Sequence, residues 1–135
     1  MKKILYICCG IFQKKIIKTI KKKGFTVYGI DERENAESKN LLDKFYNFKI
    51  QDSKKIFSKL KKINFSVIMS LNSDVGFNTA NNLSKLFDLE FLNKKKIDIF
   101  LKKNKLNIFL KKNEFPYKKF FYGSFLGYNK NYIYK

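Results

Sequence analysis

Histidine is absent from the chain, and this absence excludes several classes of enzyme. Without an imidazole there is no histidine general base, no Ser–His or Cys–His nucleophile pair and no ordinary zinc site. Cys8 and Cys9 are the only cysteines and are adjacent, so they form neither a disulfide framework nor a CxxC redox pair. No apolar run approaches the roughly 20 residues of a membrane span, and residues 4–9 are too short for a signal-peptide core. We therefore expect a cytoplasmic, reduced protein without membrane contact.

Arginine is nearly absent too, although the chain is strongly basic. Thirty Lys+Arg stand against eleven Asp+Glu, for a net charge of +19, and Arg33 is the single arginine. Proteins that grip phosphates or base edges usually use arginine, whose planar fork makes paired hydrogen bonds. We favour a compositional bias toward lysine over a selected nucleic-acid surface, and interpret the lysine runs at 21–23 and 94–96 as solvated helix faces. A domain that binds nucleic acid nonspecifically stays open as an alternative function.

Strand-like and helix-like segments alternate along the first two thirds of the chain. With 135 residues and 44% hydrophobic residues, the chain can form one compact domain with a real core. Continuous apolar runs predict strands at residues 4–9, 25–30, 45–50 and 65–71. Helical spacing predicts helices at 12–23, 52–62, 75–87 and 97–113, with Phe12, Ile16, Ile17 and Ile20 facing inward in the first. The alternation predicts an α/β fold, with a parallel sheet of about four to five strands and helices on both faces.

Ligands of such open sheets bind beyond the carboxyl ends of the strands, and candidate residues lie there. Gly10 follows the first strand, but residues 9–13 hold one glycine where a dinucleotide fingerprint needs three, which argues against a classical NAD site. Gly10 either lines a ligand pocket or only makes a tight turn between strand and helix. Asp31 ends the second strand and either accepts hydrogen bonds from ligand hydroxyls or is a solvated loop carboxylate. Ser73 and Asp74 precede a helix and either contact a ligand or only cap that helix.

Short segments, in order along the chain, resemble the amino-terminal portion of ATP-grasp ligases, the superfamily of biotin carboxylase and the carbamoyl-phosphate synthase large subunit. They are residues 3–7 with 10–13, 23–27 with 30–31 and 35–36, 43–46, 73–76 with 79–80, 86–89, and 110–116, which is similar to the family's LKxxGIP segment. The resemblance implies a three-layer, Rossmann-like, doubly wound domain at residues 1–92. It further implies a linker helix and the start of a truncated ATP-grasp region at 93–122. The aromatic residues at 120–122 by themselves predict a short strand, and residues 123–135, which have no clear period, predict an irregular tail.

Enzymes of this superfamily phosphorylate a carboxylate with ATP, and an amine or other nucleophile then displaces the phosphate. The resemblance implies an acceptor pocket that binds a small carboxylate or amine, lined by Gly10, Phe12, Gln13, Asp31, Ser73 and Asp74. Lys103, with Lys105 as the alternate, would contact ATP. ATP and Mg²⁺ are expected only in a completed enzyme, because the phosphate loop and the metal ligands have no counterpart here. We therefore expect no catalytic or metal-binding residue within the chain.

These departures leave the role of the chain open among a split subunit, a truncated gene product and a repurposed domain. A split subunit needs a second polypeptide that carries the ATP-grasp fold. It also predicts an exposed apolar face, around Ile108, Phe109 and residues 120–122, where that polypeptide would dock. The remaining alternative is a Rossmann-like module that binds a nucleotide or a sugar without catalysis.

Overall fold

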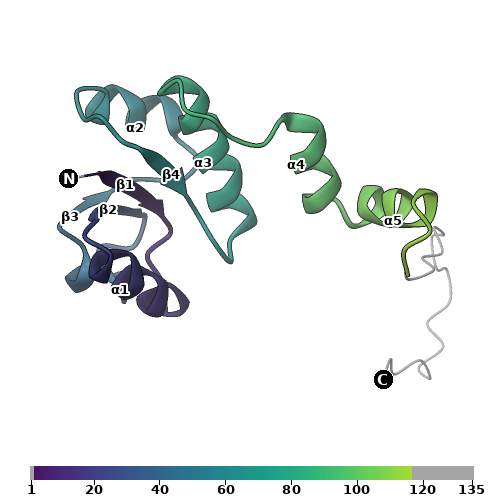
Figure 1. The fold of residues 1–135 in the computed structure, drawn as a ribbon. Coiled ribbons are helices and arrows are strands. Elements are labelled where there is room, and N and C mark those ends of the chain that lie inside the picture. Colours follow the sequence, from purple (N-terminus) through teal and green to yellow (C-terminus); the bar gives the residue numbers. More distant parts are fainter. Residues whose placement is uncertain (1, 117–135) are drawn as a thin grey trace, which may run out of the picture. The chain divides into compact units, whose positions relative to one another are not determined.

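The computed structural model describes residues 2–116, which form two compact units (Figure 1). The first unit ends at Leu92 and the second begins at Asn93. The strand expected at 120–122 and the tail expected at 123–135 lie outside the described residues. Within the described part, no helix has the length and apolar character needed to cross a membrane.

A four-stranded parallel sheet forms the centre of the first unit. Its strands are β1 (Lys3–Ile7), β2 (Thr26–Asp31), β3 (Lys44–Asn47) and β4 (Val67–Met69). Their spatial order is β3-β2-β1-β4, and all three pairings are parallel. β1 and β2 are the central strands and are buried almost throughout, as continuous apolar runs require. The predicted α/β class and the parallel sheet are confirmed.

Helices cover both faces of this sheet (Figure 1). On one face α1 (Lys14–Lys22) packs against the sheet, and Ile17, Tyr6 and Val27 form the core there. On the other face lie α2 (Ser53–Leu60) and α3 (Asp74–Leu86), over a larger core that includes Leu5, Ile30, Ile56 and Leu83. The three layers of the predicted Rossmann-like fold are therefore present.

The segment after β1 differs from the sequence prediction. The strand stops at Ile7, because Cys8 adopts a left-handed conformation, with φ of 68°, that turns the chain out of the sheet. A 3₁₀ turn at Ile11–Gln13 then precedes α1. Phe12 lies in this turn and is 78% exposed, so the prediction that it belongs to the inward face of the helix is wrong. The buried stripe of α1 begins only at Ile16.

The second unit contains two helices where the sequence predicted one. They are α4 (Lys94–Leu101) and α5 (Lys103–Lys112), and Lys102 between them is extended, with φ of −104° and ψ of 104°. The Asp98 carboxylate binds across the break, with Lys105 Nζ at 3.0 Å and Lys102 Nζ at 3.7 Å. No described residue of α5 is buried.

Candidate functional site

The loops after β1 and β4 are held together at the carboxyl edge of the sheet. Gln13 is buried, and its Nε2 donates a hydrogen bond of 3.0 Å to the carbonyl of Leu71. The Cys8 thiol donates to Ser73 Oγ at 3.4 Å. Two of the predicted site residues, Gln13 and Ser73, therefore join loops through contacts that span 58 and 65 residues of sequence.

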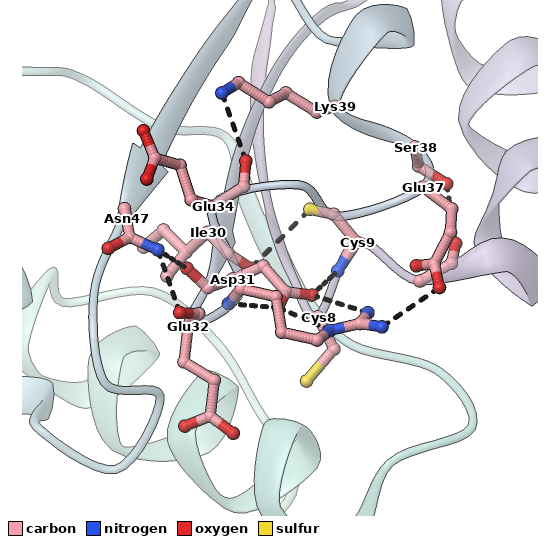
Figure 2. Close-up of polar contacts among 12 residues, drawn as sticks. Cys8, Cys9, Ile30, Asp31, Glu32, Glu34, Glu37, Ser38, Lys39 and Asn47 are labelled. Carbon is pink, nitrogen blue, oxygen red and sulfur yellow. Dashed lines mark hydrogen bonds and ion pairs between the residues drawn. The ribbon is translucent and has the colours of Figure 1, made fainter.

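Asp31 connects the same edge to the end of β2 (Figure 2). The residue is only 2% exposed, and its carboxylate accepts the Cys9 backbone N–H at 2.7 Å. It also accepts the Arg33 backbone N–H at 2.9 Å, Arg33 Nε at 3.2 Å and Arg33 Nη2 at 3.4 Å. Both carboxylate oxygens are thus occupied by donors of the chain itself, which fix the positions of the loop after β1 and of Arg33.

The ionisation of Asp31 follows from these contacts. Burial alone would raise its pKa, because a buried carboxylate loses hydration. The hydrogen bonds from the Arg33 side chain, the Arg33 backbone and the Cys9 backbone outweigh this effect and hold the pKa of Asp31 below its usual value. Asp31 is therefore a stable anion at neutral pH and does not act as a general acid.

The loop from β2 to β3 folds over Gly10 (Figure 2 shows Ser38 and Glu37 of this loop). Ser38 is fully buried and its hydroxyl donates to the Gly10 carbonyl at 2.6 Å. Arg33 Nη1 donates to Glu37 Oε1 at 3.0 Å. A Cβ at Gly10 would lie 3.1 Å from Gln13 Oε1 and 3.3 Å from Arg33 Nη2, which is tighter than ordinary contact. Gly10 therefore allows a close approach of three segments, in addition to making the turn.

The amino-terminal end of α3 completes the edge. Ser73 caps the helix, since its Oγ accepts the Gly76 N–H at 3.0 Å. Asp74 lies in the first turn, where a carboxylate interacts favourably with the helix dipole, and it is exposed. A Cβ at Gly76 would lie 2.6 Å from Cys8 Sγ and would overlap the Ser70 side chain, so this glycine lets α3 approach β1 closely.

Neither cysteine is an activated nucleophile. Burial, together with the negative charge of Asp31, raises the pKa of Cys9 to about 12. Burial also raises the pKa of Cys8, against the lowering effect of hydrogen bonds with Ser73 and Ser70. Both thiols are therefore protonated at neutral pH, and a thiol reacts as the thiolate. The cysteines at this edge therefore do not supply covalent chemistry.

The two lysines expected to contact ATP lie in the second unit and differ in their surroundings. Lys103 is the first residue of α5 and is exposed. Lys105, two residues further along, forms the ion pair with Asp98. Lys103 is thus accessible at the start of a helix, and its contact with ATP stays a prediction.

Sequence reasoning missed Arg33 and Ser38, which hold the edge together. A signal for Arg33 was present: it is the single arginine in a lysine-rich chain, and it makes the paired hydrogen bonds with a carboxylate that lysine cannot make. Ser38 gave no signal, because a serine in a polar loop is common and only the fold shows it to be buried.

Comparisons with known proteins identify this arrangement. No family model and no curated protein matches the sequence. Among solved structures, phosphoribosylglycinamide synthetase from Anaerococcus prevotii is similar over 84% of this chain and 29% of its own, with a TM-score of 0.68 and 22% identity. N5-carboxyaminoimidazole ribonucleotide synthetase from Thermotoga maritima is similar over 84% and 31%, with a TM-score of 0.67 and 25% identity. L-amino acid ligase from Bacillus licheniformis is similar over 84% and 30%, with a TM-score of 0.68 and 14% identity.

The chain has the fold of the amino-terminal part of ATP-grasp ligases. It spans about 30% of the length of these ligases. Residues 1–92 are about two thirds of the chain, so a match over 84% also includes part of the second unit. The similarity between this chain and the ligases therefore extends beyond the parallel sheet, a feature that many unrelated proteins share.

Proposed function

We propose that the chain is the acceptor-binding, amino-terminal part of an ATP-grasp ligase that joins a carboxylate to an amine or a thiol. The observation that carries this proposal is the match of three ligases to 84% of the chain, across both of its units. In the proposed reaction a carboxylate oxygen attacks the γ-phosphorus of ATP, and ADP leaves. The amine or thiol then attacks the carbonyl carbon of the acyl phosphate, and inorganic phosphate leaves.

In this proposal the carboxyl edge of the sheet binds the acceptor substrate. Phe12 and Asp74 contact it, because both side chains are exposed. Gly10 lines the same edge, but its carbonyl is already bound by the Ser38 hydroxyl, so its role is to let the loops approach one another. Gln13, Asp31 and Ser73 act as positioning residues, since their polar atoms already bind other parts of the chain. Preformed loops of this kind reduce the ordering cost of binding.

The phosphate-handling part of the reaction is assigned to a second polypeptide segment that carries the ATP-grasp fold. In this proposal that segment would also hold Mg²⁺ together with ATP. Lys103 would reach ATP in the completed enzyme. Ile108, Phe109 and Phe115 are 66%, 40% and 56% exposed, and would form an apolar docking surface for the same segment.

The acceptor role is testable with the purified chain. Millimolar L-amino acids and ribonucleotides, chosen from the names of the similar ligases, are titrated while amide NMR signals are followed. We expect one class to shift the signals of Gly10 and Gly76 more than those of α2. Asp74→Asn should weaken that binding, whereas Asp88→Asn, which changes the same charge beyond the other end of α3, should not. Equal effects of the two variants, or no selective shift with any compound, would overturn the acceptor role.

The division of labour is tested with Mg²⁺ and ATP. The isolated chain should hydrolyse no ATP, and hydrolysis should require a polypeptide with a glycine-rich phosphate loop and metal-binding carboxylates. Turnover of the isolated chain on the order of 1 s⁻¹, a rate typical of enzymes, would contradict the proposal.

A further inference from the structure

The outward face of α1 is a cluster of lysines without acidic neighbours in the helix. Lys14, Lys15, Lys18 and Lys22 are exposed, and Lys23 follows directly after the helix. In the described part of the chain these five lysines form no ion pair. We refer to these five lysines, with Ile11 and Phe12, as the α1 surface.

The beginning of this helix is electrostatically unfavourable. Lys14 and Lys15 occupy the first turn of α1, where the helix dipole favours negative charge, and no acidic residue lies there. Neither Gly10 nor Gln13, the residues that precede the two helical segments, provides a side-chain cap. A bound anion would offset the repulsion between these lysines and the helix dipole. Without an anion, the two lysines only destabilise the start of the helix.

Two exposed apolar side chains adjoin the lysines. Phe12 is 78% exposed and Ile11 is 55% exposed, in the 3₁₀ turn directly before α1. The remaining apolar residues of α1, including Ile17, are packed against the sheet. The α1 surface therefore combines an exposed aromatic ring with positive charge, but it has no apolar stripe along its length.

We propose that the α1 surface binds single-stranded nucleic acid without sequence specificity, with Phe12 stacking on a base and the lysines contacting phosphates. An accessible aromatic ring beside a basic track is the combination that such binding uses. Lysine is a suitable contact for this purpose, because phosphate contacts position the strand and carry no sequence information. An anionic membrane surface fits less well, since the apolar side of α1 is buried in the core and only the preceding turn could insert.

The proposal predicts a defined salt dependence. Five lysine–phosphate contacts on a single strand correspond to a slope of about −3.5 in log K against log salt. The affinity should therefore fall about 100-fold between 50 and 200 mM salt. Loss of the base that stacks on Phe12 should weaken binding by roughly 5- to 150-fold. The slope of log K against log salt should change little, because no phosphate contact is lost.

The experiment measures the binding of a fluorescein-labelled 15-nucleotide oligouridylate to the full chain by anisotropy, over this salt range. A triple variant of α1 (Lys14, Lys15 and Lys18 to Gln) should reduce the slope to about −1.4. The matched control is the triple variant of α2 (Lys54, Lys55 and Lys59 to Gln), which makes the same charge change on the opposite face of the sheet and should retain the slope. Phe12→Ala should weaken binding, and Ile11→Ala, a similar truncation without a ring, should not.

Three results would overturn the proposal. Equal losses in the α1 and α2 triple variants would assign the binding to net charge and not to a surface. An unchanged affinity of Phe12→Ala would remove the stacking contact. Binding to vesicles containing phosphatidylserine that excess oligouridylate fails to displace would favour a membrane partner. The two lysine triple variants change no residue that is proposed to contact the acceptor, so they test nucleic-acid binding separately from the ligase proposal.

Discussion

Replacing Asp31 by Asn tests whether the buried carboxylate holds the edge of the sheet together. The wild-type carboxylate accepts four N–H groups, one from Cys9 and three from Arg33. Asn keeps one acceptor oxygen, but its NH₂ group would face N–H donors and could not bond to them. The negative charge of the carboxylate is also lost. Hydrogen bonds to a charged group contribute about 1.5–3 kcal/mol each, and neutral ones about 1 kcal/mol. With some bonds retained in neutral form, we expect a loss of about 2–4 kcal/mol in the free energy of unfolding.

The assay is urea unfolding followed by circular dichroism at several pH values. Because the pKa of Asp31 is lowered in the folded protein, its contribution is fully present above the ordinary aspartate pKa of about 3.9. That contribution is lost as the pH falls through the lowered pKa. The difference between wild type and Asp31→Asn should therefore be constant from pH 7 to pH 5 and decrease below about pH 4.

Asp43→Asn is the matched control. Asp43 also accepts a backbone N–H, from Val27 at 2.7 Å, and pairs with Lys21 at 2.8 Å, but its side chain is 35% exposed. We expect this variant to lose only about 1 kcal/mol, because solvent compensates an exposed group. If Asp31→Asn lost no more than the control, or if its effect did not change between pH 7 and pH 3, the structural role of Asp31 would be refuted.

Three further predictions concern the same edge. Gly76→Ala should lower the free energy of unfolding by at least about 1 kcal/mol in urea, because overpacking against Cys8 exceeds the gain in helix propensity. Ser38→Ala should cost about 1–3 kcal/mol, because the Gly10 carbonyl loses a buried donor, and a loss below 0.5 kcal/mol would contradict that contact. At pH 8 the native protein should react slowly with a thiol reagent, because burial raises the pKa of Cys9 to about 12 and also raises that of Cys8. In urea, where this burial is lost, both cysteines should react rapidly.

Much of the first unit could be predicted because local and long-range preferences agree there. A continuous apolar run such as that of β1 is suited to a strand buried on both faces, and the fold buries it so. Asp31 was placed correctly at the end of a strand because it follows a continuous apolar run, and Ser73 at the start of a helix because serine is a preferred N-cap residue. In each of these cases the residue and its immediate neighbours contain the relevant information.

The misplaced features depend on contacts that the sequence does not display. Cys8 is left-handed because its neighbours in β2 and α3 fix the turn, whereas the residue type itself favours a continued strand. Phe12 matched the helical period, but α1 starts two residues later and leaves the ring in solvent. The break between α4 and α5 at Lys102 has no proline or glycine nearby that would have predicted it. The ion pairs that Asp98 makes across the break became visible only in the structure.

The polar groups at the carboxyl edge are used mainly to bind one another, and this has a consequence for recognition. Gln13, Asp31 and Ser38 are buried; Gln13 binds the loop after β4, whereas Asp31 and Ser38 both bind the loop after β1. The edge is therefore preorganised, but few buried polar groups remain to select one small molecule among others. A ligand held mainly by exposed atoms gains little free energy, because water competes for each hydrogen bond. We expect millimolar affinity for an acceptor in the isolated chain and a marked increase once a second segment closes over the edge. The same affinity with and without that segment would show that acceptor recognition is complete in this chain.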